Sequence, residues 1–457
     1  MSDKPVELRC RSVVDGIAWP AIGDGFASQL QSLLFQLEYS QWLPENVLRA
    51  EQLAQLKPLL RHARSTVPHY GQALHGLDID ALTWDAFQAL PLLTPKNLQV
   101  EFESLKSAAV PPGHGGIAEG KTSGSTGTPV HFLVTGITQL FWSALTVREH
   151  LWHARDFSGK LASIRVKVEE GYWRDWGSPV AKLFHTGPLA ALNVRTSVEK
   201  QLDWLVQQNP DYLITHASNL LALAELSLRR GIRLPRLRQA RSFSEALRSD
   251  LRETVNRAWG VPVADVYSCE EAGSIALQCP HSENYHVQSE NLLVEILDEA
   301  GQPCRPGETG RVVITTLHNF AMPLIRYALD DYAVVGTPCP CGRQLPVLAK
   351  IHGRRRNMIV LPDGQQHWPS FPRIRYSGVA PISQIRLIQR TLCRVDAIFT
   401  AERALTSVER HGMVAAIHES LGYPFEVELI AVDEMPRQAN MKFEDIISEV
   451  AAGSAPR

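Results

Sequence analysis

The chain has 457 residues, more than a single hydrophobic core usually supports, so at least two domains are expected. Hydrophobic residues make up 44% and charged residues 21% of the sequence, values that are ordinary for globular proteins and exclude disordered and fibrous classes. The formal net charge of −2 creates no global field that would attract nucleic acid or an anionic membrane. We therefore expect neither as a partner.

The N-terminal residues contain no apolar run of signal-peptide length, and no stretch reaches the roughly 20 apolar residues that cross a bilayer. These features predict a cytoplasmic location. The seven cysteines are an odd number spread over a long chain, which is untypical of a disulfide framework. They are expected to be reduced thiols or metal ligands.

Apolar residues at helical spacing predict a helical lead-in over residues 1–90, clearest between residues 26 and 67. Predicted helices then alternate with short β-rich segments. The helices are expected at 137–152, 199–208, 217–230 and 246–259, and the strands at 162–166, 211–215 and 262–267. This alternation predicts an α/β sheet covered by helices.

After residue 286 the pattern becomes that of an antiparallel ribbon, with strands at 292–297 and 311–317. From residue 353 several strands, the first at 357–361, surround one helix at 404–420, which predicts a small α+β domain. The expected fold is therefore α/β, with a large N-terminal domain, residues 1–352, and a C-terminal α+β domain, residues 353–457.

Residues 121–129 read KTSGSTGTP, a run of glycines and hydroxyls. Glycine lets the backbone approach a ligand, and closely spaced N–H and O–H groups form a nest for an anion such as a polyphosphate. A flexible linker is the alternative. The proline and the apolar segment 130–134 that follow favour a nucleotide-binding loop. We expect this phosphate loop to span residues 121–130.

A P-loop pattern, G-x-x-x-x-G-K-[ST], overlaps this loop between Gly115 and Thr122. That motif requires a buried strand before it and a helix directly after it. Proline and glycine upstream exclude a central strand, and residues 123–129 are too rich in glycine, serine and proline to begin a helix. The P-loop interpretation is rejected.

Two thiol-bearing turns flank the predicted ribbon, so residues 279–341 form a candidate zinc-binding region. One turn contains Cys279 and His281, with His286 nearby, and the other contains Cys339 and Cys341. Structural zinc requires four sulfur or nitrogen ligands, commonly from two short loops. Three cysteines and either histidine would complete such a site, whereas unpaired cysteines in turns are the alternative.

Several further segments follow the phosphate loop in a fixed order. They are YSCEEAG at 267–273, PLIRY at 323–327 before Asp331, GR at 353–354, and PR at 436–437 before Lys442, with LPLLTPK at 90–96 preceding the loop. This order resembles the adenylate-forming acyl-CoA synthetase superfamily, and within it the phenylacetate-CoA ligase-like group. The resemblance covers most of the chain. It implies an adenylation domain at 1–352 and a mobile lid domain at 353–457.

The resemblance implies roles in binding the phosphates of ATP. The β- and γ-phosphates would be held by Ser123, Gly124, Ser125, Thr126, Gly127 and Thr128. Glu271 would bind Mg²⁺, with Glu270 as the neighbouring alternative. Lys442 would bridge the substrate carboxylate and the α-phosphate during adenylation.

The resemblance also implies a nucleoside site. Tyr267 and Ser268 would lie near the adenine, opposite a turn formed by Ser244, Glu245 and Ala246. Asp331, or the adjacent Asp330, would accept hydrogen bonds from the ribose hydroxyls. Arg354 would reach the ribose or a phosphate. Among the zinc candidates, the resemblance favours His286 over His281.

Three departures from the family pattern concern the loop and the C-terminal segment. The loop ends with Thr128, Pro129 and Val130 and lacks the lysine that many members carry, so neutralisation of phosphate charge is expected to depend on Mg²⁺ and hydroxyls. Arg356 and Asn357 replace the usual acidic hinge pair, with Arg356 the expected pivot, and Met441 replaces the glycine before Lys442.

The function implied is that of an ATP-dependent, AMP-forming acid–thiol ligase. It would activate a carboxylic acid, aryl or arylacetic by group membership, and transfer it to coenzyme A or a carrier-protein phosphopantetheine. One alternative is an adenylating enzyme of specialised metabolism with an amine acceptor or a different activated group; another is an inactive zinc-bearing scaffold. A homodimer is the commonest assembly for such enzymes. The acid-binding wall is expected within 140–245, where Trp142, Trp152, Tyr172, Trp173 and His216 are candidates.

Overall fold

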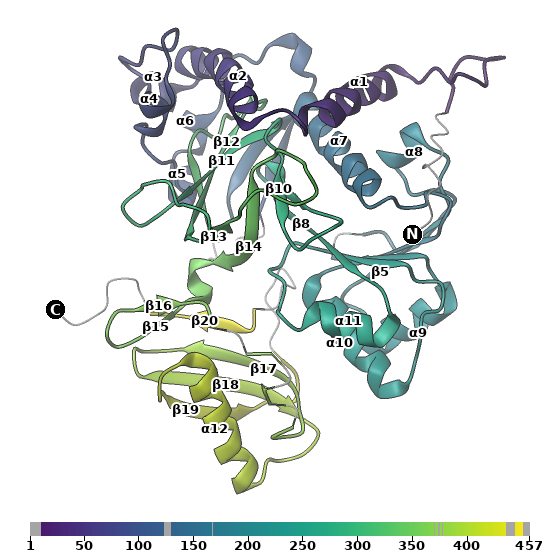
Figure 1. Cartoon of the computed structure of the whole chain (residues 1–457), viewed down its shortest axis with the longest axis vertical. Helices are drawn as coiled ribbons and strands as arrows, with labels where there is room; N and C mark the ends of the chain where they lie inside the picture. Colours follow the sequence, from purple (N-terminus) through teal and green to yellow (C-terminus); the bar gives the residue numbers. More distant parts are fainter. Residues whose placement is uncertain are drawn as a thin grey trace. The chain divides into compact units, whose positions relative to one another are not determined.

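The computed structural model describes residues 11–122, 129–166, 168–369, 371–372, 375–376, 378–435 and 444–450 (Figure 1). It divides into two compact units. Unit 1 comprises Met1–Thr215, Leu234–Ser244 and Val261–Ile351, and unit 2 comprises His216–Arg233, Glu245–Gly260 and His352–Arg457. The predicted α/β class, with a large sheet and a smaller C-terminal α+β part, is confirmed. Among the described residues, no helix combines the length and apolar character needed to cross a membrane.

A twelve-stranded sheet forms the centre of unit 1 within the described residues. In sheet order its strands are β11 (Leu292–Leu297), β12 (Thr309–Thr316), β13 (Tyr327–Val335), β14 (Val347–Arg354), β10 (Tyr285–Val287), β9 (Gly273–Gln278), β8 (Val263–Cys269), β7 (Gln239–Phe243), β6 (Tyr212–Thr215), β3 (Leu161–Arg165), β5 (Leu189–Asn193) and β4 (Gly171–Trp173). The ribbon predicted from residue 286 is present as β11 and β12, which pair antiparallel.

The strands β5, β3, β6, β7 and β8 are parallel neighbours. In the sheet, β5 lies on one side of β3, and β6, which follows β5 along the chain, lies on the other side of β3. Such a reversal of strand order is a topological switch point, and open α/β sheets bind ligands outside the carboxyl ends of the strands there. The ends of β3 and β6 are therefore candidate ligand-binding positions.

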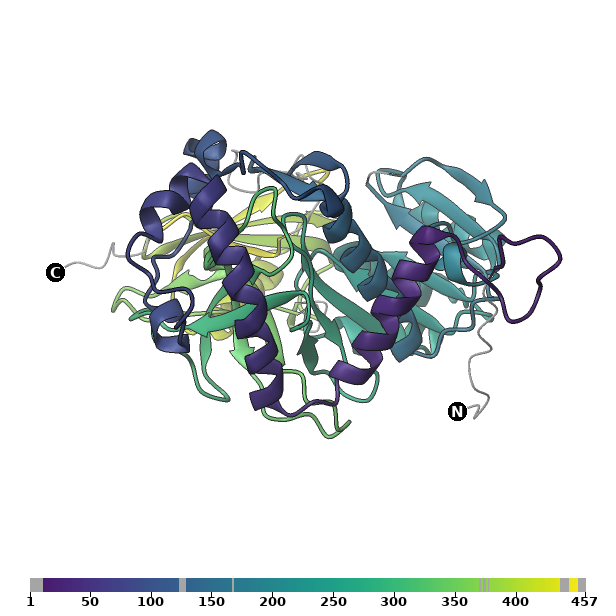
Figure 2. The ribbon, with the colours of Figure 1, turned by 90° about the horizontal axis from the view of Figure 1, so that it is seen from above.

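Helices of unit 1 cover the sheet, and Figure 2 shows α1 and α2, in purple, lying over it. Leu56 and Leu60 of α2 share one hydrophobic core with Leu292 and Ile314, whereas α1 packs with α7 in another. The helices are α1 (Gly25–Ser40), α2 (Glu45–Thr66), α3 (Pro68–Ala73), α4 (Trp84–Gln88), α5 (Pro95–Val100), α6 (Phe102–Leu105), η1 (Pro112–His114), α7 (Gly136–Trp152), α8 (Val180–Leu183) and α9 (Val198–Gln208).

Unit 2 contains a four-stranded sheet in the order β19-β18-β17-β20. Its elements are α10 (Ala217–Arg230), α11 (Leu251–Trp259), η2 (Arg355–Asn357), β15 (Ile359–Val360), β16 (Gln366–His367), β17 (Ile382–Gln389), β18 (Arg394–Ala401), α12 (Ser407–Leu421), β19 (Glu426–Ala431) and β20 (Ile446–Ser448). Met413, Ile417 and Leu421 of α12 pack into the core formed with β17 and β18.

Some element boundaries differ from the sequence-based expectation, including those of α11, β15 and α12, the last expected at 404–420 and observed at Ser407–Leu421. The helix predicted from residue 246 begins only at Leu251, after Asp250. The strand predicted at 357–361 is limited to Ile359–Val360, because η2 precedes it and the Asn357 side chain donates a hydrogen bond to the carbonyl of Ile446 at 2.8 Å. The start of β15 therefore depends on a contact between distant segments, which local sequence patterns do not contain.

A buried ion cluster ties α7 to the sheet. The Glu149 carboxylate is fully buried and accepts hydrogen bonds from the Arg155 guanidinium at 2.6 Å, and the Nε of Arg241 lies 3.2 Å away. Burial alone would raise the pKa of Glu149, but the two arginines lower it well below its usual value. The cluster contributes stability that is present at neutral pH and is lost as the pH falls below the ordinary carboxylate range.

We predict that Glu149→Gln destabilises unit 1 strongly, because it leaves buried guanidinium charge uncompensated. The expected loss is about 3–5 kcal/mol, seen as a lower denaturant midpoint. Glu45→Gln is the control, since the Glu45–Arg49 pair is exposed at 3.6 Å and such pairs contribute about 0.5 kcal/mol or less. Equal midpoints for the two variants would contradict the prediction.

Candidate functional site

A β-hairpin flanks the predicted phosphate loop, whose residues 123–128 lie outside the described part of the chain. Strands β1 (Ile117–Lys121) and β2 (His131–Thr135) pair antiparallel, with Lys121 opposite His131. The Thr122 N–H donates to the Val130 carbonyl at 2.9 Å, and the Val130 N–H donates to the Thr122 hydroxyl at 3.0 Å. The hairpin therefore brings the two ends of the loop together. Because β1 runs through the P-loop-like pattern, that interpretation is excluded.

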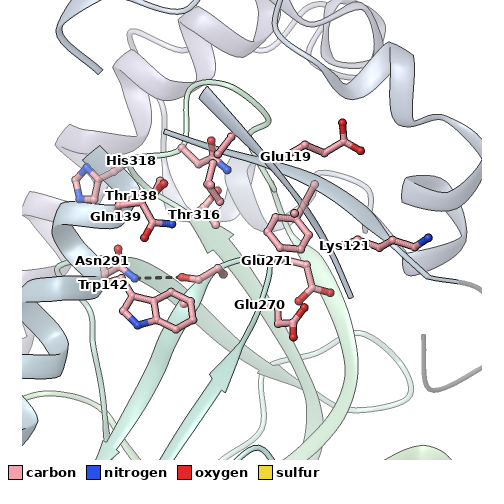
Figure 3. Close-up of a pocket in the computed structure, with 17 residues that line it drawn as sticks. Glu119, Lys121, Thr138, Gln139, Trp142, Glu270, Glu271, Asn291, Thr316 and His318 are labelled. Carbon is pink, nitrogen blue, oxygen red and sulfur yellow. Dashed lines mark hydrogen bonds between the residues drawn. The ribbon is translucent and has the colours of Figure 1, made fainter. Parts of the chain in front are cut away.

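A cavity of about 350 Å³ lies beside this hairpin (Figure 3). Its walls come from the hairpin, the start of α7, the turn between β8 and β9, and the ends of β11 and β12. The polar lining residues include Glu119, Lys121, Thr138, Gln139, Glu270, Glu271, Asn291, Thr316, His318 and Asn319, and Trp142 is the largest aromatic one. The cavity thus has both polar and apolar walls and lies beside the hairpin from which the predicted phosphate loop extends.

Glu271 places a partly desolvated carboxylate in this cavity. Burial raises the pKa of Glu271, and the neighbouring carboxylates of Glu270 and Asp331 raise it further. Burial and the Glu271 charge likewise raise the pKa of the Cys269 thiol well above its usual value. A cation bound here would relieve this accumulation of negative charge. Oxygen ligands from one or two carboxylates plus substrate phosphates are the usual environment of Mg²⁺, so the residues present fit that ion.

Lys121 is a cavity residue that the sequence reasoning did not assign a role. Its neighbour on the same face of β1, Glu119, is engaged by His131, whose Nδ1 lies 2.7 Å from the Glu119 carboxylate. The exposed Lys121 ammonium has no ion-pair or hydrogen-bond partner among the described residues. It lines the cavity together with Glu270 and Glu271 (Figure 3). The alternation of side chains along β1 could have suggested this placement only once the hairpin register was known.

Two of the residues predicted to bind the nucleoside, Tyr267 and Asp331, are in contact in unit 1. The buried Tyr267 hydroxyl donates to the Asp331 carboxylate at 2.9 Å, so the structure joins Tyr267 with Asp331. Asp330 has a positive φ of 65°, and Ser268 lies at a bulge in the β8–β9 pairing. Ser244 follows β7 with a φ of 74°, a conformation that side chains other than glycine rarely adopt.

In unit 2, Glu245 is already engaged by its neighbours. Its carboxylate accepts hydrogen bonds from the Ser218 N–H at 2.7 Å and from the Ser218 hydroxyl at 3.2 Å, at the start of α10. The exposed Ala246 lies beside Gly353, whose φ is 80°. This geometry gives Glu245 a helix-capping role, in which its charge lies near the positive end of the helix dipole.

The predicted hinge region contains an acidic partner that the sequence reasoning missed. Arg356 Nε donates to Glu444 at 3.0 Å, and the Arg354 N–H donates to the Asn357 side chain at 3.2 Å. Glu444 thus supplies the carboxylate that is absent next to Gly353 in the sequence. The predicted catalytic Lys442 lies outside the described residues, as do Pro436 and Arg437.

The aromatic candidates for the acid-binding wall have different positions. Trp142 lines the cavity and contacts the position of Gly273, whereas Trp152 is buried and donates its Nε1–H to Gln41 at 2.9 Å, so its role is core packing. Tyr172 is exposed on the edge strand β4, which also carries Trp173. His216 is a buried residue that precedes α10 in unit 2.

The four predicted zinc ligands converge. The candidate atoms of Cys279, His286, Cys339 and Cys341 all lie within 4.8 Å of one another. The sulfurs of Cys279 and Cys339 are 3.7 Å apart, and Cys341 Sγ is 3.3 Å from His286 Nε2. His281 is exposed and lies outside this group, so the geometry selects His286.

The thiols of Cys279 and Cys339 in this cluster differ in pKa. Burial raises the pKa of Cys279 to about 11. Burial would also raise the pKa of Cys339, but hydrogen bonding by Ser282 and by the backbone of Cys341 lowers it to about 7. Three sulfurs and one imidazole nitrogen match the donor set of structural zinc, and no coordination position would remain open for a substrate.

No protein-family model matches the chain. The phenylacetate-coenzyme A ligase of Thermus thermophilus is 26% identical over 344 residues, covering 72% of this chain and 75% of the relative. The enzyme of the same name from Pseudomonas putida is 28% identical over 334 residues, covering 69% and 72%. A crystal structure of 2-hydroxyisobutyryl-CoA ligase in the postadenylation state matches with a TM-score of 0.70 and 17% identity, covering 89% of this chain and 91% of that one.

The chain resembles phenylacetate-CoA ligases in sequence and an acyl-CoA ligase in fold. The predicted resemblance to the adenylate-forming superfamily is confirmed. The phosphate-loop hairpin, the Tyr267–Asp331 pair and the carboxylate of Glu271 are thus the parts of the chain that support a functional proposal.

We predict that the chain purifies with stoichiometric zinc, and that Cys341→Ala loses most of it, because a structural site needs all four ligands. Elemental analysis by mass spectrometry measures the metal, and a lower Tm should accompany its loss. Cys393→Ala is the matched control, since Cys393 is an exposed free thiol outside the cluster. Zinc absent from the wild-type chain, or retained in Cys341→Ala, would contradict the assignment.

Proposed function

We propose that the chain is an ATP-dependent, AMP-forming ligase that activates a carboxylic acid as an acyl-adenylate and transfers the acyl group to the thiol of coenzyme A. The observation that carries the proposal is the arrangement around the cavity of unit 1. The cavity combines a hairpin that presents a glycine- and hydroxyl-rich loop, the desolvated Glu271 carboxylate and, next to them, the Tyr267–Asp331 pair. The sequence similarity to phenylacetate-CoA ligases supports the same reaction class.

The two half-reactions place distinct demands on the site. In the first, a carboxylate oxygen attacks the α-phosphorus of ATP and the bond to pyrophosphate breaks. In the second, the thiol sulfur, having lost its proton, attacks the acyl carbonyl and AMP leaves. Negative charge accumulates on the phosphoryl oxygens in the first step, so fixed donors and cations that face them lower the barrier most.

Each described residue has one task in this proposal. Glu271 would hold Mg²⁺, which when bound neutralises phosphate charge. Asp331 would accept hydrogen bonds from the ribose, and Tyr267 fixes its orientation through their hydrogen bond. Residues 123–128 would donate to the β- and γ-phosphates, and Lys442 would bridge the two reacting groups. In this proposal the phosphate loop binds the phosphates of ATP, and Lys442 completes the site for adenylation only.

Aryl or arylacetic acids are the proposed substrates, since the sequence relatives are phenylacetate-coenzyme A ligases. A carrier-protein thiol or an amine is the alternative acceptor. An adenylation domain at 1–352, with a lid at 353–457 that moves between half-reactions, is proposed from the same resemblance.

The reaction class is tested with the full-length protein, ATP and Mg²⁺. We expect pyrophosphate release that depends on an aryl or arylacetic acid, and a thioester product when coenzyme A is added. Lys442→Ala should abolish acid-dependent pyrophosphate release yet still convert a supplied acyl-adenylate to the thioester. An inactive zinc-bearing scaffold would instead give no thermal shift with ATP and Mg²⁺, whereas a ligand at about 100 times its dissociation constant stabilises by about 2.7 kcal/mol.

We further predict that Lys121 supplies the cation that the end of the predicted phosphate loop lacks. A hydrogen bond to a charged group contributes about 1.5–3 kcal/mol, so Lys121→Met should lower kcat/KM for ATP by about ten- to hundredfold. The reason is that Lys121 lines the cavity and has no protein partner among the described residues.

Two variants sharpen this test. Thr128→Lys in the Lys121→Met background places a lysine at the end of the predicted phosphate loop, and it should recover part of the lost kcat/KM. Lys200→Met removes an exposed lysine from α9 and should leave kcat/KM unchanged. An unchanged kcat/KM in Lys121→Met would remove Lys121 from the phosphate site.

A further inference from the structure

Strand β3 presents two polar side chains to the face of the sheet that α7 covers. Side chains alternate along a strand, so Leu161, Ser163 and Arg165 share one face. Leu161 belongs to the same hydrophobic core as Leu145 of α7, which identifies that face. The three residues thus lead from the packed core under α7 to the carboxyl end of β3.

Ser163 has an unsatisfied buried hydroxyl. The residue is 2% exposed, and its Oγ has no hydrogen-bond partner among the described residues. A buried polar group without a partner is destabilising, and most such groups in proteins are satisfied by protein, water or ligand. A polar ligand atom next to Ser163 would therefore satisfy its buried hydroxyl.

Arg165, two residues further along this face, carries a charge that no described residue compensates. It makes no ion pair or hydrogen bond through its side chain within the described residues. Its side chain is exposed, yet the protein mass around the guanidinium lowers its pKa.

The groups around Arg165 add positive charge. Arg241, on the adjoining part of the sheet, is close enough to Arg165 for their charges to repel each other. The single carboxylate of Glu149 serves both Arg155 and Arg241, and Asp265 is occupied by hydrogen bonds from Ser242 and Tyr285. The described part of this region thus holds more guanidinium groups than free carboxylates.

The position coincides with the topological switch point. Arg165 is the last residue of β3, and the reversal of strand order lies between β3 and β6. Ligands of open α/β sheets bind outside the carboxyl ends of the strands at such points. An uncompensated arginine and an unsatisfied hydroxyl therefore occur together where the fold itself favours a ligand.

We infer that Arg165 and Ser163 bind a second anionic group of the substrate acid, so that the preferred substrate is a dicarboxylic acid. The inference rests on the proposed function and names its substrate class. A carboxylate accepts two hydrogen bonds from the planar guanidinium fork and supplies the missing negative charge. The serine hydroxyl donates a further hydrogen bond to the same group. The other carboxylate of the acid remains available for adenylation.

The test uses matched pairs of acids that differ by one carboxylate: phenylacetate with para-carboxyphenylacetate, and benzoate with terephthalate. Calorimetry measures binding of each acid to the full-length protein, and pyrophosphate release measures turnover separately. The wild-type protein should bind the diacid of at least one pair about tenfold more tightly, or better, than its monoacid. Arg165→Met should abolish this preference without weakening the monoacid, and Ser163→Ala should reduce it.

One control variant and the contradicting outcomes complete the test. Arg305→Met removes an exposed arginine between β11 and β12, at the other end of the sheet, and should preserve the preference. Equal binding of monoacid and diacid by the wild-type protein, or no binding of any pair, overturns the inference. Equal weakening of both acids in Arg165→Met also overturns it, because Arg165 would then hold the reacting carboxylate. A bound diacid without pyrophosphate release supports the inference and rejects the proposed function.

Discussion

The hydrogen bond between the Tyr267 hydroxyl and the Asp331 carboxylate is the constraint on which the site depends. Tyr267 lies on β8, at the end of the parallel strands, and Asp331 lies on β13, in the antiparallel part, with β14, β10 and β9 between them in sheet order. The bond is possible only because the antiparallel strands curve back toward β8 around a shared core that contains Tyr267, Tyr285 and Tyr327. The same curvature brings the turn with Glu271 beside the loop hairpin. A single sheet therefore positions both Asp331, which is proposed to bind the ribose, and Glu271, which is proposed to bind the metal.

Uncompensated charge is a second feature that the proposed binding groups share. Glu271 is a carboxylate whose charged form is disfavoured by burial and by neighbouring acids, and Lys121 is a cation without a protein partner among the described residues. Arg165 is a cation of the same kind at the end of β3. By contrast, Glu149 is fully paired by arginines and Glu245 by the start of α10, so these two acids stabilise the fold. The distinction follows the physical expectation that binding groups are left for ligands to complete, whereas structural ions are satisfied within the protein.

Much of this organisation could be predicted from the sequence, because the informative patterns are local. Helical and strand periodicity predicted α1, α2, α7, α9 and β11, and the spacing of Cys279, Cys339 and Cys341 predicted a thiol cluster that the structure brings together. The rest depends on contacts between distant segments. Glu444 meets Arg356 across 88 residues, and the role of Trp152 as a core residue depends on Gln41. The choice of His286 over His281, which the family resemblance favoured, agrees with the convergence of the four candidate ligand atoms. The sequence also does not predict the positions of the Lys121 and Arg165 side chains, since only the strand register shows which face of its strand each one occupies.

The central claim is that a carboxylate oxygen of the substrate attacks the α-phosphorus of ATP. The most direct measurement uses a substrate acid labelled with a heavy oxygen isotope in its carboxylate, followed by mass spectrometry of the nucleotide and phosphate products after thioester formation. Passage through an acyl-adenylate leaves a labelled oxygen in AMP and none in pyrophosphate. Label in inorganic phosphate with ADP as the nucleotide product, or unlabelled AMP, would contradict the account.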